Sequence, residues 1–80
     1  MIKQLEMKIE YAANVMARTI RNGEDQTPLG YERWGKLVGL CIAYKIAMGL
    51  ESRAHISLAS EFLERAQVEL GHIDAEGYAA

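Results

Sequence analysis

Few side chains of this sequence are of the types that carry out covalent or metal chemistry. His55, His72 and Cys41 are the only histidines and the only cysteine, and they are not paired at helical spacing. Because a metal site needs several converging ligands, we expect no metal site. Cys41 follows Leu40 in an apolar stretch, where burial raises the pKa of a thiol and leaves it unreactive.

Nucleophilic catalysis is not indicated either, because it requires a nucleophile, a base and a group that orients the base. Ser57 and Ser60 lie near His55 in the chain, but the helical pattern places both serines on an exposed side. The segment 23–30, GEDQTPLG, is acidic where a phosphate-binding loop has a lysine. We therefore expect a protein that is not an enzyme and that carries no cofactor.

Residues suited to binding are concentrated around the start of the second predicted helix. Tyr, Trp and Arg side chains are enriched where proteins bind partners, and Tyr31, Arg33 and Trp34 stand there beside Lys36. Basic groups on the other side of the preceding loop add donors for an anion. An alternative interpretation makes Trp34 a core residue and the charges solubilising groups. The candidate binding residues are Tyr11, Arg18, Arg21, Thr27, Tyr31, Arg33, Trp34 and Lys36.

An all-α fold is expected to position these residues. Eighty residues, half of them apolar, suit one domain over residues 1–80. Apolar residues recur at three- and four-residue steps, which is typical of amphipathic helices. The pattern predicts three helices at about 1–22, 28–48 and 52–70, with a loop at 23–30 and a flexible tail at 71–80.

Capping residues mark the ends of these helices. Thr27, followed by a proline, is typical of a helix start, with the threonine as N-cap. Gly23, Gly49 and Gly71 are typical of helix ends, because glycine readily adopts the left-handed conformation found there. Since the segment 49–52 is short, we expect a tight antiparallel hairpin between the second and third helices.

The second helix carries a stripe of small side chains, Gly35, Gly39, Ala43 and Ala47, which recur every four residues. Glycine inside a helix costs up to about 1 kcal/mol relative to alanine. Two glycines on one face therefore indicate that another helix approaches closely. That helix belongs either to the same chain or to a second subunit.

The amount of apolar surface favours the subunit interface. From Val38 to Leu50 the second helix is apolar nearly all round, with only Lys45 clearly polar. A helix with no polar face is buried on every side. The first helix also has a broad apolar face that includes Met7 and Tyr11. The sequence therefore predicts a homo-oligomer, most simply a two-fold dimer built around the second helix.

Charge and hydropathy disfavour nucleic acids and membranes as partners. Residues 1–50 hold seven Lys or Arg and five Asp or Glu, a net charge of +2, whereas residues 51–80 hold two and six, a net charge of −4. No helix has the clustered basic and amide side chains of a recognition helix. The longest apolar stretch is shorter than the about 20 residues that span a bilayer. The N-terminal segment also interrupts its apolar residues with charges, unlike a secretory signal, so the expected location is the reducing cytoplasm.

The third predicted helix contains Ser57-Leu58-Ala59, Leu63-Glu64 and Ala66. This spacing, together with the apolar helix before it and Ser52-Arg53 between them, resembles the helical hairpin of phage cyclic-nucleotide sponge proteins, which are small anti-defence proteins. The resemblance covers roughly residues 37–66. The family has an aromatic-rich continuation where this chain has Gln67–Leu70, and no ligand residue is carried over. The resemblance implies an oligomer that binds cyclic oligonucleotides without cleaving them, in the cytoplasm of an infected host.

These patterns lead to one expected function and two alternatives. We expect a small, non-catalytic, homo-oligomeric helical protein that binds a macromolecular partner as an inhibitor or adaptor. The first alternative is a phage-type sponge that sequesters cyclic oligonucleotide signals. The weaker alternative is a DNA-binding regulator, whose binding would depend strongly on salt.

Overall fold

The computed structural model describes residues 2–49 and 55–73, and within these residues the protein is all-helical. Helix α1 spans Ile2–Arg21, α2 spans Pro28–Ala47 and α3 spans His55–Glu69. The all-α class is confirmed, and the first two helices match their predicted bounds to within one residue. The predicted start of the third helix at Ser52 lies outside the described residues.

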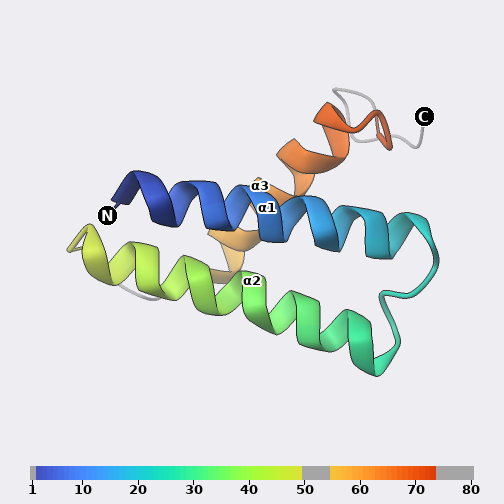
Figure 1. Ribbon diagram of the computed structural model, residues 1–80, viewed down its shortest axis with the longest axis horizontal. Helices are drawn as coiled ribbons and strands as arrows, with labels where there is room; N and C mark the ends of the chain where they lie inside the picture. Colours follow the sequence, from blue (N-terminus) through green and yellow to red (C-terminus); the bar gives the residue numbers. More distant parts are fainter. Residues whose placement is uncertain (1, 50–54, 74–80) are drawn as a thin grey trace.

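The antiparallel pair of the fold is formed by α1 and α2, which lie side by side and are joined by a short loop (Figure 1). Helix α3 crosses this α1–α2 pair obliquely and packs against both helices (Figure 1). The tight reversal expected between the second and third helices involves residues beyond Gly49 that lie outside the described part of the chain. The α2–α3 hairpin therefore stays a prediction.

The first helix ends at a glycine, as the sequence predicts. Gly23 has a φ of +75°, and its N–H donates to the Ile20 carbonyl at 3.0 Å. The Glu24 N–H donates to the Thr19 carbonyl at 2.9 Å. This pair of bonds, which satisfies the Thr19 and Ile20 carbonyls, is the usual way in which a helix ends at a glycine.

The second helix begins at its predicted N-cap. The Thr27 Oγ1 accepts the Gly30 N–H at 3.2 Å, and Pro28 follows as the first helical residue. Thr27 also donates through Oγ1 to the Glu24 carbonyl at 2.6 Å, which ties the loop to the helix. Gly49 and Gly71 have φ values of +71° and +74° at the ends of α2 and α3, so these two predicted stops are confirmed as well.

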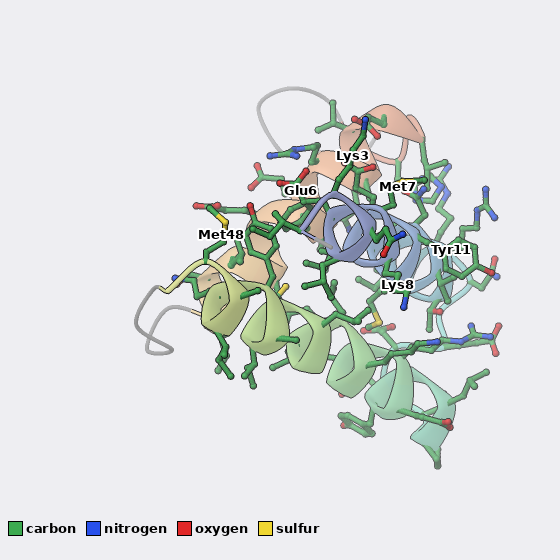
Figure 2. The ribbon with its side chains drawn as sticks, turned by 60° about the vertical axis from the view of Figure 1, so that its left-hand side comes forward. Lys3, Glu6, Met7, Lys8, Tyr11 and Met48 are labelled. Carbon is green, nitrogen blue, oxygen red and sulfur yellow. The ribbon has the colours of Figure 1, made fainter. Side chains whose placement is uncertain are left out.

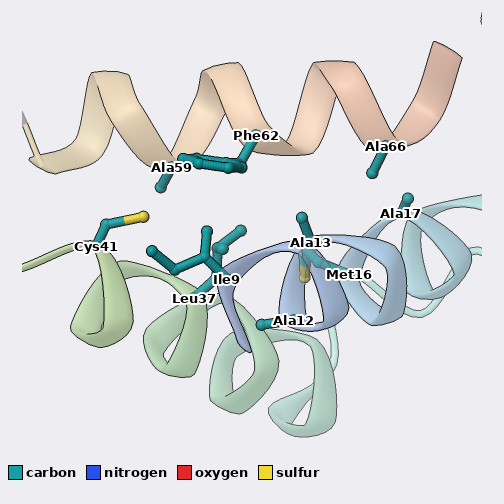
Figure 3. Packing of buried hydrophobic residues seen from close by; sticks show 10 residues of the cluster. All are labelled: Ile9, Ala12, Ala13, Met16, Ala17, Leu37, Cys41, Ala59, Phe62 and Ala66. Carbon is teal, nitrogen blue, oxygen red and sulfur yellow. The ribbon is translucent and has the colours of Figure 1, made fainter. Parts of the chain in front are cut away.

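The core lies where all three helices meet. Ile9 of α1 and Leu37 of α2 are the largest side chains that are completely buried. Ala17 of α1 and Ala66 of α3 face each other (Figure 3), and their small side chains let the two helices approach closely there. The buried apolar cluster comprises Ile9, Ala12, Ala13, Met16, Ala17, Leu37, Cys41, Ala59, Phe62 and Ala66.

Helix α3 contributes both fully buried and half-buried side chains on its inner face. Leu58, Leu63 and, just after the helix, Leu70 are half-buried and pack against the core cluster. Ala59, Phe62 and Ala66 are the buried members of that face.

Candidate functional site

A groove runs between α1 and α2, and all of its lining residues come from these two helices. Its end near the interhelical loop is a cavity of about 250 Å³, and it continues into a second cavity of about 440 Å³. The two cavities share Tyr11 and Lys36. We call this feature the α1–α2 groove. It is lined by Met7, Lys8, Tyr11, Ala12 and Val15 of α1 and by Leu29, Glu32, Arg33, Lys36 and Leu40 of α2.

The apolar side chains at the groove are unusually open to solvent. Tyr11 is 68% exposed, Met7 61% and Leu29 40%. Met7, Lys8 and Tyr11 project from one side of α1, whereas Lys3 and Glu6 project elsewhere (Figure 2). An exposed apolar strip of this kind, rimmed by polar residues, marks an interaction site more often than an ordinary surface does.

Arg33 is held in position at the groove by a buried threonine. Its Nη1 donates to the Thr19 Oγ1 at 2.7 Å, and the same hydroxyl donates to the Val15 carbonyl at 2.7 Å. Thr19 is the one buried polar side chain among the described residues. Because a threonine is neutral, this hydrogen bond orients the guanidinium without neutralising its charge. Arg33 therefore brings a fixed positive charge to the groove.

Of the eight binding residues predicted from the sequence, the structure brings three together. Tyr11, Arg33 and Lys36 line the same cavity. Arg18 is exposed on the last turn of α1. Arg21 is directed toward the C-terminal end of α3, where its Nη1 donates to the His72 carbonyl at 3.5 Å.

The other three predicted binding residues have structural neighbours of their own. The Thr27 hydroxyl accepts the Gly30 N–H as the N-cap of α2 and donates to the Glu24 carbonyl of the loop. The exposed Tyr31 donates through its hydroxyl to the Gln26 Oε1 at 3.0 Å. Trp34 is half-buried against the core cluster. This position agrees with the alternative interpretation, in which Trp34 is a core residue.

The sequence patterns did not single out several residues that line the groove. Lys8, Leu29 and Leu40 belong to it, and Thr19 supports it from behind. The available signal was the apolar extension of the first helix through Met7 and Tyr11. Combining this signal with the antiparallel pairing of α1 and α2 would have placed Leu40 opposite these residues.

The stripe of small residues on α2 is open to solvent. Gly35, Gly39, Ala43 and Ala47, which we call the α2 stripe, are all exposed. A Cβ atom built on Gly35 or Gly39 meets no other group within 4 Å. Within the described residues, the close approach of a helix from the same chain is therefore not the reason for these glycines.

The ionisable groups with shifted pKa values lie away from the groove. Burial raises the pKa of the Cys41 thiol, and the nearby Lys45 offsets this shift in part. The Tyr44 hydroxyl donates to the Glu6 Oε1 at 3.0 Å, which raises the pKa of Tyr44. Across residues 2–49 and 55–73, no three His, Cys, Asp or Glu side chains form a group that could hold a metal ion.

In comparisons with known proteins, no protein-family model, no curated protein and no solved structure matches this chain. None of the helices in the described part of the chain combines the length and the apolar character needed to cross a membrane.

Proposed function

We propose that this protein is a small, non-catalytic, homo-oligomeric interaction protein, most simply a two-fold dimer, that acts in the cytoplasm as an inhibitor or adaptor toward a macromolecular partner. The observation that carries the proposal is the exposed α2 stripe. Gly35 and Gly39 lie in the interior of a 20-residue helix, where each glycine weakens the helix, yet within the described residues they allow no close contact.

A second copy of the chain supplies the missing contact. Small side chains let two helix backbones approach closely. More atoms of the backbones and of the neighbouring side chains are then in contact than between helices with large side chains. Ile46, which is 67% exposed, lies beside the α2 stripe and would be buried in such a contact. A two-fold axis through the stripe makes the same surface serve both subunits.

The Gly39→Leu substitution tests this proposal. A Cβ atom at this position meets no other group of the described residues within 4 Å, and leucine is a better helix former than glycine by about 1 kcal/mol, so the isolated subunit should keep its fold. We expect sedimentation of the native chain to show a dimer at micromolar concentration, and the variant to sediment as a monomer.

The control is Lys3→Leu, which adds the same side chain to an exposed position of α1 outside the groove and the stripe. This variant should remain dimeric. A native chain that sediments as a well-folded monomer would contradict the dimer, and so would a Gly39→Leu variant that dimerises as the native chain does.

A second candidate function is a sponge for cyclic oligonucleotides, of the kind encoded by phages. It is favoured by one observation, the presence of Tyr11, Arg33 and Lys36 in a single cavity of about 250 Å³. An aromatic ring can stack on a base, and the two cations can bind phosphates. Calorimetric titration with cyclic di- and trinucleotides should show heat of binding, whereas flat traces would remove this candidate.

A further inference from the structure

The α1–α2 groove is elongated. Its second cavity, which shares Tyr11 and Lys36 with the first, shares Met7 and Lys8 with a third hollow that Gln4 also lines. Along α1 the lining runs from Gln4 to Val15, which is about 16 Å at the rise of an α-helix. A groove of this length accommodates about three turns of a helix, and a compact small molecule would fill only part of it.

The groove also has a distinct chemistry. Its floor is apolar, and Met7 adds a flexible side chain that adapts to different shapes. Three of the four charged side chains that line the groove are basic: Lys8, Arg33 and Lys36, against Glu32. The complementary ligand therefore has an apolar strip flanked by negative charges.

Building on the proposed role as an interaction protein, we propose that the α1–α2 groove binds an acidic amphipathic helix of a partner protein. Apolar side chains at positions i, i+4 and i+7 of that helix pack between Met7, Tyr11 and Leu40, which is how helices bind in grooves. Its carboxylates lie beside Lys8 and Lys36 at the rim and reach Arg33 at the end near the loop.

The chain itself does not offer such a helix among its described residues. The outer face of α3 is acidic through Glu61, Glu64 and Glu69. Its exposed large apolar residues, however, are Ile56 and Val68, which stand twelve positions apart and cannot both enter the groove as neighbouring anchors. A second copy placed groove to groove would instead bring the basic rims together. Since no described helix of this chain fits the groove, the occupant that we propose is a helix of a different protein.

The experiment measures binding of synthetic helical peptides to the full chain. The probe has about 16 residues, enough to form a helix on binding, with leucine at i, i+4 and i+7 and glutamate on its other faces. The control peptide has the same leucines and carries lysine in place of glutamate. We expect the acidic peptide to bind about tenfold more tightly, an effect of the size that three partly exposed charge pairs produce, and salt should reduce the difference.

Substitutions in the chain locate the binding. The double substitution Lys8→Glu and Lys36→Glu should reverse the preference between the two peptides. Lys3→Glu is the control for the Lys8→Glu half of this variant, because each of the two changes the charge of α1 equally and Lys3 lies outside the groove lining. It should keep the preference for the acidic peptide. Tyr11→Ala should weaken binding of both peptides, because Tyr11 contributes apolar contact.

Several results would overturn the proposal. They are equal affinity for the two peptides, no binding of either peptide, or an unchanged preference in the double variant. Displacement of the acidic peptide by a tighter-binding cyclic dinucleotide would assign the groove to a nucleotide. If the native chain is a dimer and the double variant is a monomer, the groove would be assigned to a second copy of the chain. If the native chain is monomeric and still prefers the acidic peptide, the dimer fails and the groove assignment stands.

Discussion

At the scale of single residues, one side-chain contact links the beginning of α1 to the end of α2. The Tyr44 hydroxyl donates a hydrogen bond to the Glu6 carboxylate across the two helices. This bond raises the pKa of Tyr44, and desolvation and the negative charge of Glu6 act in the same direction. The contact therefore makes part of the stability of the α1–α2 pair depend on pH.

The sign of this dependence follows from the direction of the shift. Because the pKa of Tyr44 is higher in the folded chain than in the unfolded chain, the stabilisation is fully present below the unfolded value of about 10. It is lost as pH rises through the folded value. We expect the Tyr44→Phe variant to be less stable than the native chain at neutral pH, and the difference in free energy of unfolding to shrink in alkaline solution.

Urea unfolding at several pH values measures this difference. Tyr31→Phe is the matched control, because it removes a hydroxyl that hydrogen-bonds only to the exposed Gln26. If the stability difference between the native chain and the Tyr44→Phe variant were independent of pH up to alkaline conditions, the hydrogen bond to Glu6 would not contribute as described.

At the scale of the helix, the glycines of α2 have different reasons to be there. Gly30 is buried, and a Cβ atom at this position would collide with the backbone carbonyl oxygens of Glu24 and Asp25. At Gly39 a Cβ atom would meet nothing. Gly30 is therefore required by the loop that packs against the helix. No group among the described residues requires a glycine at position 39.

Alanine substitutions at these two positions should therefore have opposite effects. Gly30→Ala should lower the free energy of unfolding by about 1–3 kcal/mol, because the backbone must move to accept the methyl group. Gly39→Ala should raise it by up to about 1 kcal/mol through helix propensity. Urea unfolding in dilute solution, where subunits are dissociated, measures both values. Changes of the same sign would contradict these roles.

The helix ends could be predicted from the sequence because they depend on local bonds. Thr27 caps α2, and Gly23 and Gly71 terminate α1 and α3, through hydrogen bonds to residues a few positions away. The oblique crossing of α3 depends on contacts between distant parts of the chain, such as Ala17 with Ala66 (Figure 3). No local pattern contains that information.

The candidate site could be predicted only in part, for the same reason. Arg33 and Lys36 were found because they are neighbours in the sequence, and Tyr11 because it extends an apolar face. Thr19, which holds Arg33, was missed because their contact joins positions fourteen residues apart across the loop. Arg21 was grouped with these residues from the sequence, and only the fold shows that its side chain is directed toward His72 instead.

At the scale of the whole molecule, the two sides of the α1–α2 pair differ. Helix α3 packs across one side (Figure 1), while the groove and the α2 stripe are not lined by α3. Exposed apolar surface at the groove and the α2 stripe is costly for a small chain, because a single core of this size contributes only a few kcal/mol of net stability. A subunit on the stripe and a helix in the groove would each reduce this exposed apolar surface.

The position of Cys41 gives the molecule a built-in reporter of how often its core opens. The thiol is completely buried, so an alkylating reagent reaches it only in molecules whose helices have transiently separated. The labelling rate at fixed pH then measures the population of these open molecules. If subunits associate through α2, labelling should accelerate on dilution, because dissociation removes the stabilisation that the partner provides. A rate independent of protein concentration would mean that association does not protect the core.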